Sequence, residues 1–327
     1  MKGFFRLSLV AFFISATFLA AVSGLQAKQG ATPSGAPPAG FLTVRDDAGR
    51  TVVLAEKPQR IVVLSPSFLD LLYAVGGKAA GRPSSTAKLS ALPKQARKIA
   101  EVGFVYNINL EKVVALQPDL VIAMDGMHEA LLPVLESNGI PVLMLKYKTY
   151  DDVFDKIVLF GAIAGTKAKA AATVQAIKSK LKRITDQLPA QPVKIAILHA
   201  TSKSVSLELE SSIAGNTAKL LRLRNIAAAS RPLESGATVT PYSLEKLVES
   251  DPDLIFVVTM GKAAEIEKTM RADVESNPAW AVLRAVRQQK LFFLPSELFL
   301  LNPGLRIPEA AAYMAKLAYP EVYGSVK

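Results

Sequence analysis

The stretch NLEKVVALQPDLVI, residues 109–122, has the pattern of a surface helix that runs through a Pro-Asp turn into a buried strand. A second copy, SLEKLVESDPDLIF, occupies residues 243–256 and is identical at seven of the fourteen positions. The offset between the copies is 243 − 109 = 134 residues, and the apolar runs that begin at Ile61 and Ile195 have the same offset. Two separate segments with one offset indicate that an α/β unit occurs twice in this chain.

Each unit alternates strands with helices. The runs RIVVLSPS (60–67) and KIAILHA (194–200) have the continuous apolar character of parallel strands that helices cover on both faces. Ahead of the first unit, FLTVRD and RTVVLA flank Asp47-Ala48-Gly49, a turn combination that predicts a hairpin. The fold class that we expect is α/β, with two Rossmann-like lobes whose sheets are mainly parallel.

The segment between the two units is helical. DVFDKIVLFGAIAG (152–165) is followed by Thr166, a residue type typical of N-caps, and then by 22 residues without Gly or Pro. This pattern predicts one long bridging helix of roughly 34 Å. A single helix between two lobes permits only limited opening, and such a fold holds its ligand in the crevice at the carboxyl ends of the strands.

The first 27 residues have the composition of an export signal. Lys2 and Arg6 form a charged start, the run Leu7–Leu25 is apolar, and Ala27 offers a small residue for cleavage. An uncleaved membrane anchor is the alternative, because the apolar run approaches the length of a bilayer span. The chain has no cysteine, so it offers no lipid-bearing cysteine at the signal junction, and we expect a free periplasmic protein rather than a lipoprotein.

The length of 327 residues suits two domains of ordinary size. The predicted regions are a signal peptide (1–27), a flexible lead-in (28–40), an N-terminal α/β lobe (41–148), a bridging helical region (149–190) and a C-terminal α/β lobe (191–327).

The composition argues against several classes of function. The formal charge of +11 is spread along helices that also carry acidic residues, which favours a solvated surface over nucleic-acid binding. Two histidines and no cysteine cannot assemble a tetrahedral His/Cys zinc site. Dinucleotide and phosphate-loop glycine patterns are missing, and Ser65 lacks the glycines of a nucleophile elbow. The sequence therefore does not favour an enzyme, and no intrinsic cofactor is expected.

Four segments carry a family resemblance: RDDAGRTVVLAEKPQRIVVLSPSFLDLLYAVGG (45–77), VGFVYNINLEKVVALQPDLVIA (102–123), NPAWAVLRAVRQQKLFFLP (277–295) and NPGLRIPEAAAYMAKL (302–317). From Phe41 to about Tyr323, the chain resembles the periplasmic solute-binding proteins of bacterial ABC importers for iron siderophores, haem and cobalamin. The resemblance implies two α/β lobes bridged by one long helix, a monomer that binds a small-molecule metal chelate, and a permease dimer with ATPase subunits as its partner.

The resemblance also implies a role for the repeated helix. In relatives, a glutamate at this position of each lobe meets arginines of the two permease subunits, and the matching residues here are Glu111 and Glu245. The structural alternative is that each glutamate only favours its helix, because both lie in a first turn behind the N-caps Asn109 and Ser243. A helix-capping role explains one copy better than it explains two.

Ligand contacts are expected in loops that follow the strands. The candidates are Ser67, Arg82, Tyr106, Asn107, Met127, His128, Tyr242 and Arg306. In haem-binding relatives this loop often supplies an axial tyrosinate, so the resemblance makes Tyr106 a candidate iron ligand, with His128 or Met127 as others. The alternatives are that Tyr106 stacks on any bulky chelate, that His128 caps a helix, and that Arg306 holds its own loop.

These observations predict an exported binding protein that captures a metal chelate, either a ferric siderophore or haem, and delivers it to an inner-membrane ABC importer. One alternative is a cobalamin-binding protein of the same family. Another is an exported chelatase-like enzyme in which His128 or His199 works with a nearby carboxylate.

Overall fold

The computed structural model describes residues 40–84 and 93–325. The predicted signal peptide and nearly all of the predicted lead-in lie outside the described residues. The first described elements are β1 (Leu42–Arg45) and β2 (Thr51–Leu54), which pair antiparallel and confirm the predicted hairpin. Asp46 and Asp47 attach the hairpin to the following sheet, because the Asp47 N–H donates to the Met144 carbonyl at 3.0 Å and the Met144 N–H donates to Asp46 at 3.2 Å.

The first six-stranded sheet has the order β6-β5-β4-β3-β7-β8. All neighbours in it are parallel except β5 and β6, which form an antiparallel pair at one edge. Its strands are β3 (Ile61–Val63), β4 (Gly81–Ser84), β5 (Ala100–Phe104), β6 (Asn107–Ile108), β7 (Leu120–Met124) and β8 (Val142–Leu145).

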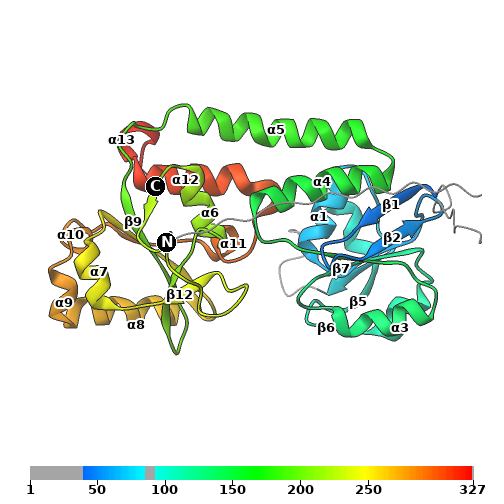
Figure 1. The fold of residues 1–327 in the computed structure, drawn as a ribbon, viewed down its shortest axis with the longest axis horizontal. Coiled ribbons are helices and arrows are strands. Elements are labelled where there is room, and N and C mark those ends of the chain that lie inside the picture. Colours follow the sequence, from blue (N-terminus) through cyan, green and yellow to red (C-terminus); the bar gives the residue numbers. More distant parts are fainter. Residues whose placement is uncertain (1–39, 85–92, 326–327) are drawn as a thin grey trace, which may run out of the picture. The chain divides into compact units, whose positions relative to one another are not determined.

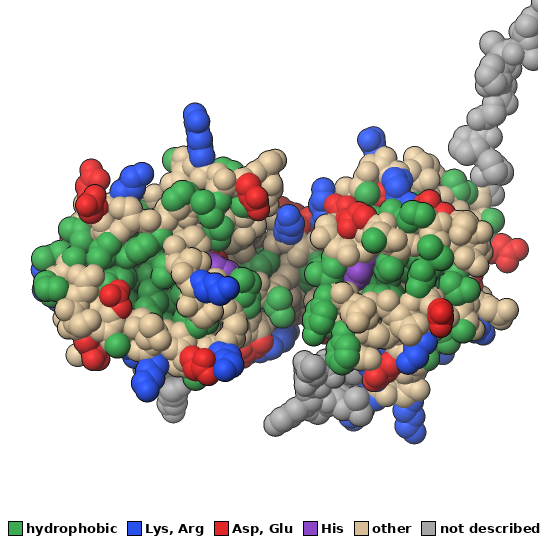
Figure 2. All heavy atoms as spheres, turned by 90° about the horizontal axis from the view of Figure 1, so that it is seen from below, with side chains coloured by type: hydrophobic (Ala, Val, Ile, Leu, Met, Phe, Trp, Pro, Cys, Tyr) green, Lys and Arg blue, Asp and Glu red, His purple; other side chains and the backbone are tan. Residues whose placement is uncertain are grey.

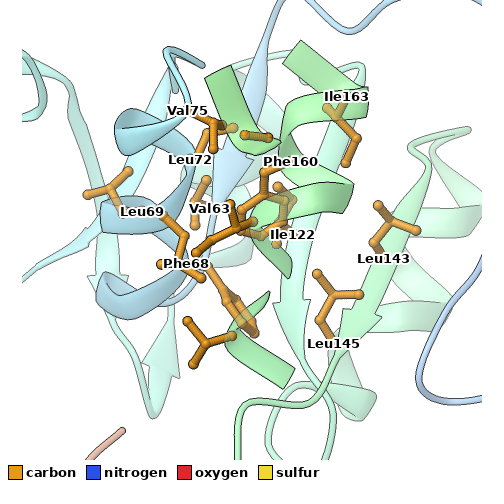
Figure 3. Close-up of a cluster of buried hydrophobic side chains, with 14 of the residues drawn as sticks. Val63, Phe68, Leu69, Leu72, Val75, Ile122, Leu143, Leu145, Phe160 and Ile163 are labelled. Atoms are coloured by element: carbon orange, nitrogen blue, oxygen red, sulfur yellow. The ribbon is translucent and has the colours of Figure 1, made fainter. Parts of the chain in front are cut away.

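Helices cover this sheet and enclose its core. They are α1 (Pro66–Ala74), α2 (Leu110–Ala115), α3 (Leu132–Ser137) and the short 3-10 helices η2 (Lys94–Lys98) and η3 (Glu129–Leu131). Figure 3 shows Phe68 and Leu72 of α1 directed toward Phe160 and toward Ile122 of β7, within one cluster of buried side chains. Burying such side chains contributes roughly 1.5 to 3 kcal/mol each, so this cluster stabilises the packing of α1 on the sheet.

The second sheet has the order β12-β10-β9-β13-β14, and β11 also pairs with β9. The pairs that β9 makes with β11 and β13, and β13 with β14, are parallel, whereas β10 is antiparallel to both β9 and β12. The strands are β9 (Lys194–Ala200), β10 (Val205–Glu208), β11 (Arg224–Asn225), β12 (Val239–Pro241), β13 (Leu254–Thr259) and β14 (Leu291–Phe293). The sequence had not predicted β10 or β12, whose antiparallel ladder extends the sheet beyond the duplicated part.

The second half of the chain also contains eight helices and one 3-10 helix among the described residues (Figure 1). They are α6 (Ile213–Leu220), α7 (Leu244–Ser250), α8 (Ala263–Ser276), α9 (Pro278–Ala281), α10 (Arg284–Arg287), α11 (Ser296–Phe299), η4 (Gly304–Arg306), α12 (Ile307–Ala318) and α13 (Pro320–Tyr323).

Two helices connect the sheets. The first, α4 (Tyr150–Ala164), begins with a capping box between Thr149 and Asp152 and ends at Gly165, whose φ of 71° is left-handed. The second, α5 (Lys167–Thr185), is the predicted bridging helix, and its 19 residues span about 28 Å. Thr166 occupies the predicted N-cap position, although its side chain makes no capping hydrogen bond.

The duplication is visible in hydrogen bonds as well as in sequence. Ile61 of β3 pairs with Leu120 of β7, and Ile195 of β9 pairs with Leu254 of β13, so both partners repeat at an offset of 134. The predicted α/β class with mainly parallel sheets is confirmed. Contacts join the described residues into one compact unit, so the lobe boundaries near 148 and 190 stay a prediction.

Each repeated Pro-Asp turn clamps a neighbouring strand. The Asp119 carboxylate accepts hydrogen bonds from the Arg60 N–H at 2.9 Å, and the Asp253 carboxylate accepts one from the Lys194 N–H at 3.0 Å.

A cation closes each clamp. The Arg60 side chain donates to the Leu116 carbonyl at the end of α2, and the Lys194 side chain donates to the Ser250 carbonyl at the end of α7, in each case with one distance of 2.9 Å. A cation at a helix carboxyl end is favourable because the last carbonyls lack partners within the helix. Each clamp consists of a strand residue, a helix-end residue and an aspartate, and all three recur at the offset of 134. The clamp therefore explains why the Pro-Asp turn occurs in both copies.

Candidate ligand-binding site

A cavity of about 680 Å³ lies at the carboxyl ends of strands from both sheets. This volume is within the range of about 300 to 1,000 Å³ that is typical of small-molecule sites. It is lined by Ser65, Pro66, Ser67, Val105, Met124, Met127, Tyr147, Lys148, His199, Glu208, Ser211, Ser212, Ile213, Gly236, Ala237, Thr238, Val239, Met260, Phe299, Leu300, Leu301 and Asn302. The position agrees with the crevice that the sequence predicted.

The lining is mainly apolar. Three methionines contribute to it, and two of them, Met127 and Met260, are 46% and 50% exposed although methionine is normally buried. Figure 2 shows hydrophobic side chains exposed on one face of the protein, with basic and acidic side chains scattered among them. Thioether side chains are flexible and polarizable, so they adapt to the surface of a bulky apolar ligand.

The charged and titratable side chains of the lining are few. Lys148 is the one Lys or Arg among the cavity residues, Glu208 is the one carboxylate, and His199 is the one histidine. His199 lies on β9 and Glu208 on the adjacent strand β10, and their Nδ1 and Oε1 atoms are 2.9 Å apart. The cavity therefore holds one imidazole–carboxylate pair, with Glu208 buried and His199 half-buried, in a lining that also includes serine, threonine and asparagine side chains.

His128 is a structural residue in this molecule. Its Nδ1 accepts a hydrogen bond from the Met124 N–H at 3.0 Å, and its Nε2 is 2.6 Å from the Val105 carbonyl. The ring is 3% exposed, and burial lowers the pKa of His128. Because both nitrogens already have backbone partners, the geometry contradicts the prediction of His128 as an iron ligand. The imidazole instead fixes the end of β7 to the loop that carries Tyr106.

Arg82 is also structural. The guanidinium is 2% exposed, donates to the Ala96 carbonyl at 2.9 Å, and forms an ion pair with Glu101 at 2.7 Å. Arg82 does not line the cavity, so the structure does not place its side chain where a chelate could meet it. A buried arginine that binds backbone carbonyls holds η2 against the sheet.

Tyr106 lies in the exposed turn between β5 and β6, and Asn107 is the first residue of β6. Tyr106 is 75% exposed, and its ring stacks on Phe104 with 6.2 Å between the centroids. Their neighbour Val105 lines the cavity, whereas Tyr106 and Asn107 stand next to it. Tyr106 and Asn107 are therefore available at the rim, and their role stays a prediction.

Tyr242 and Arg306 are separate from the cavity lining. Tyr242 packs on the core that contains Ile255 and Trp280, and burial raises the pKa of its hydroxyl to about 12. Arg306 forms a bidentate ion pair with Glu309 at 2.8 and 2.7 Å, which fits the alternative that it holds its own loop. Of the eight predicted ligand residues, Ser67 and Met127 are the ones that line the cavity.

Glu111 and Glu245 occupy equivalent and exposed positions. Each lies in the first turn of its helix, behind Asn109 and Ser243, whose side chains accept the N–H of Lys112 and Lys246. Among the described residues neither glutamate has a hydrogen-bond or ion-pair partner. The caps are therefore complete without the glutamates.

A second cavity of about 450 Å³ shares Ser67, Tyr147 and Asn302 with the first. It also contains Asp70, which has no ion-pair partner among the described residues, and burial raises the pKa of this carboxyl to about 6. The Tyr147 hydroxyl between the two cavities is buried without a hydrogen-bond partner in the described part of the chain. The larger cavity remains the candidate site because strand ends of both sheets contribute to it.

Sequence reasoning missed Glu208 and Tyr147. The alternation in VSLELE (205–210) indicates a strand with one buried face, and it would have placed Glu208 beside His199 if β10 had been recognised. Tyr147 closely follows the strand β8, which is the position where cavity residues of the other strands lie. Among the described residues, no group of three or more His, Cys, Asp or Glu side chains is arranged to hold a metal ion.

An α/β protein with a mainly apolar cavity at the ends of its parallel strands, and with no assembled catalytic or metal centre in the described residues, has the features of a small-molecule binding protein. Residues 61–298 match the periplasmic binding protein family, and the chain belongs to this family. Its relatives bind substrates for transport, and the chain is accordingly a binding protein and not an enzyme.

Curated relatives are similar over most of their length. The chain is 26% identical to the uncharacterized ABC transporter substrate-binding lipoprotein YvrC of Bacillus subtilis, over 86% of this chain and 87% of YvrC. It is 27% identical to the Fe(3+) dicitrate-binding periplasmic protein FecB of Escherichia coli, over 83% and 87%. It is also 27% identical to the vitamin B12-binding protein of Salmonella typhimurium, over 64% and 75%.

Solved structures share the fold. An ABC transporter substrate-binding protein from Listeria monocytogenes superposes with a TM-score of 0.70 at 22% identity, over 80% of this chain and 99% of that protein. IsdE of Staphylococcus aureus, solved in complex with heme, superposes with a TM-score of 0.66 at 19% identity, over 80% and 98%. These likenesses establish the fold of the chain.

Proposed function

We propose that this protein captures a metal chelate, with a ferric siderophore or haem as the first candidates, and delivers it as a monomer to an inner-membrane ABC importer. The observation that carries the proposal is the 680 Å³ cavity at the carboxyl ends of strands from both sheets, in a chain of the periplasmic binding protein family. Ser67 and Met127 contact the chelate from the first sheet, and Met260 contacts it from the second. Tyr106 and Asn107 meet it at the rim.

The relatives support this ligand class. FecB is named for ferric dicitrate, IsdE was solved with heme, and the Salmonella relative is named for vitamin B12. All three ligands are metals held by an organic chelator, so the shared chemistry is a metal complex too large to be bound as a bare ion. Cobalamin is the second candidate, on the strength of the vitamin B12-binding relative.

Delivery to the importer rests on Glu111 and Glu245. Both carboxylates are exposed, and the duplication presents one at the same position of each half. A permease dimer with two-fold symmetry has two equivalent docking sites, and it can bind one such carboxylate at each. Since the caps are complete without the glutamates, both carboxylates are available to a partner outside this chain.

Export brings the protein to the periplasm, the compartment from which such an importer takes up its ligand. In this proposal the signal is cleaved near Ala27, and the mature chain is free because it has no cysteine to carry a lipid. None of the helices within residues 40–84 and 93–325 is long and apolar enough to cross a membrane. Mass spectrometry of the exported protein tests this: a mass without residues 1–27 and without lipid supports it, and an intact amino terminus or a lipid adduct contradicts it.

A titration tests the binding function. Protein purified from the periplasm of cells that express the full chain is titrated with ferric dicitrate, haem and cobalamin, while absorption and heat are recorded. We expect one of the three to bind one-to-one and to be released unchanged. Failure of all three and of a ferric tris-catecholate siderophore to bind, or conversion of the chelate into a new product, would contradict the proposal.

A further inference from the structure

The bridging helix α5 differs from the other helices in its charge. Among its 19 residues it has six basic side chains and no acidic one. The other described α-helices with three or more charged side chains, α4, α7 and α8, carry both signs. The mixed charge that is typical of a plain solvated helix is therefore missing from α5. The basic residues, all of them exposed, are Lys167, Lys169, Lys178, Lys180, Lys182 and Arg183.

The local stability of the helix explains only part of this charge. Lys182 and Arg183 suit the carboxyl end of α5, where cations are favourable, and Lys182 also pairs with Asp186 at 2.7 Å. Lys167 is the first residue of the helix, where the helix dipole disfavours a cation. No acidic residue of the first turn compensates it. The amino end of α5 thus carries charge that the helix itself does not need.

The spacing of the other cations is also unfavourable within the helix. Lys178 and Lys182 are four residues apart, so they bring like charges to neighbouring positions of one face. Lys180 and Arg183 are three apart, and neither side chain has a hydrogen-bond or ion-pair partner among the described residues. Lys178 lies over the Phe154 ring, 5.1 Å from its centroid. A helix selected only for stability would gain from acidic residues here, so the charge of α5 points to an anionic partner outside this chain.

More positive charge lies beside the amino end of α5. Lys57 approaches Gly165, since a Cβ at that glycine would lie 3.1 Å from the Lys57 Nζ. Lys169 reaches toward Gly76 after the end of α1, with a corresponding distance of 3.2 Å. The side chains of Lys57 and Lys167 have no partner in the described part of the chain. Cations therefore occur at both ends of a helix that spans about 28 Å.

The exposed face of α5 is low between its cations, because its other exposed residues are small or uncharged. The lysine and arginine side chains are therefore the longest groups on this face, and together they can reach one extended surface. The large hydrophobic side chains that are exposed in the described residues include none from α5, so such a contact would rest on charge and not on insertion. The residues between the cations are Ala168, Ala171, Ala172, Gln175, Ala176 and Ser179.

The helix is separate from the sites already described. It packs on α4 and α12 (Figure 1), and neither of the two cavities contains one of its residues. Glu111 and Glu245 belong to α2 and α7. The cations of α5 are spread along a convex helix and do not converge on one point, which suits a surface of many anionic groups better than a single free phosphate.

We propose that α5, together with Lys57, forms a binding surface for the anionic phospholipid headgroups of the membrane that faces the exported protein. The cations hold the protein at that membrane by charge alone, so the contact is reversible and sensitive to salt. This inference uses the exported location of the proposed function but not its chelate. It assigns a task to a helix that otherwise only bridges the two sheets.

Vesicle sedimentation tests the binding surface. Protein purified after export, without chelate, is mixed with vesicles of phosphatidylcholine that contain phosphatidylglycerol, and separately with vesicles of phosphatidylcholine alone. We expect binding to the anionic vesicles only. It should be lost when the salt concentration rises from about 0.1 M to about 1 M, because the screening length falls from about 10 Å to about 3 Å. Equal binding to both kinds of vesicle would overturn the inference.

Two double variants show whether α5 or the net charge is responsible. Lys167→Gln/Lys180→Gln removes two cations without partners from α5. Lys268→Gln/Lys290→Gln is the matched control, since it removes the same charge from two exposed lysines of the second half that also have no side-chain partner in the described residues. Each lysine near an anionic lipid surface strengthens binding by about fivefold, so the α5 variant should bind about 25-fold more weakly. The control should bind as the wild type does.

The Lys167→Glu variant separates lipid binding from folding. An acidic side chain suits the first turn of a helix, so this variant should unfold at the same temperature as the wild type or a higher one. Its affinity for anionic vesicles should fall by about 25-fold, because the change removes one positive charge and adds a negative one. A loss of stability with unchanged vesicle affinity would assign Lys167 to the fold and overturn the inference.

The remaining outcomes are equally decisive. A loss that is confined to the α5 variants supports the inference, whereas equal losses in the α5 and control double variants overturn it. Binding to a short DNA duplex without binding to anionic vesicles also overturns it, because the partner would then be a different anion. A protein that binds a chelate but no vesicle loses this inference and keeps the proposed function, and a protein that binds vesicles but no chelate does the reverse.

Discussion

The two copies of the repeat differ in what surrounds them, although their clamps are the same. Around the first copy, the cavity side ends in the β5–β6 turn, which His128 fixes by two backbone hydrogen bonds. Around the second copy, the antiparallel strand β10 lies between β12 and β9 and brings Glu208 to His199. The duplicated elements are alike in the two halves, so the chemical character of the cavity comes from the segments that differ between them.

The largest effect is expected on chelate uptake when the glutamates shared by the two copies are removed. The double variant Glu111→Ala/Glu245→Ala should reduce chelate uptake by cells to the background level and leave chelate affinity unchanged, because both carboxylates are exposed and unpaired in the described residues. Each single variant should lose part of the uptake.

Glu56→Ala/Glu249→Ala is the matched control, since it removes two exposed carboxylates, one from each half, at positions that the duplication does not relate. This control should transport normally. Normal uptake by the Glu111/Glu245 double variant would show that the repeated glutamates do not dock.

The next largest effect is expected on the stability of the protein when His128 is removed. His128→Ala leaves the buried Met124 N–H and Val105 carbonyl without partners, so we expect the free energy of unfolding in urea to fall by about 2 to 4 kcal/mol. A His128→Ala variant as stable as the wild type would contradict the structural role assigned to this imidazole.

Removing the aspartate of either clamp should lower the free energy of unfolding by almost the same amount. Asp119→Ala and Asp253→Ala each remove a carboxylate that accepts a strand N–H, and each should lower the free energy of unfolding by about 1 to 2 kcal/mol. Asp119 also accepts the Gln59 N–H at 2.6 Å, and Asp253 also forms an exposed ion pair with Arg284 at 2.7 Å, so the two losses should be of similar size. Urea denaturation of both variants measures this, and a clamp that costs nothing in either half would leave the repeated Asp unexplained.

The smallest effect is expected on the pH dependence of stability and comes from Asp70, which lies in the first half. Burial raises the pKa of Asp70 to about 6, so the folded protein holds this proton at pH values where the unfolded chain has released it. The free energy of unfolding therefore falls as the pH rises from about 4 to about 6, and the penalty is fully present above about pH 6.

Asp70→Asn should remove that penalty. We expect this variant to be more stable than the wild type by about 1 to 2 kcal/mol at about pH 7.5 and to lose the advantage near pH ~4. Thermal unfolding at both pH values checks the sign. A gain in stability from Asp70→Asn that is equal at the two pH values would rule out titration of this carboxyl as the cause.

The repeat made the fold predictable from sequence. Two segments with one offset indicated two parallel sheets, and the hairpin at Asp47-Ala48-Gly49 and the bridging helix after Thr166 followed from turn and capping patterns. Boundaries were less accurate: the bridging helix ends at Thr185 rather than at Leu188, because its last residues form a turn ahead of Pro189.

The site was predictable only in part, because loop residues after strands can face either the cavity or the core. Ser67 and Met127 line the cavity as predicted, whereas Arg82 turns inward to bind carbonyls and Arg306 pairs with Glu309. Glu208 was missed because β10 belongs to the part of the second sheet that has no counterpart in the repeat. Periodicity locates strands, but the direction of a loop side chain depends on tertiary contacts.

The crystal structure of the chelate-loaded protein tests the central claim most directly. The account predicts the chelate in the 680 Å³ cavity, against Met127 and Met260, with Glu111 and Glu245 exposed. A chelate bound instead in the smaller cavity around Asp70, or elsewhere on the surface, would contradict it.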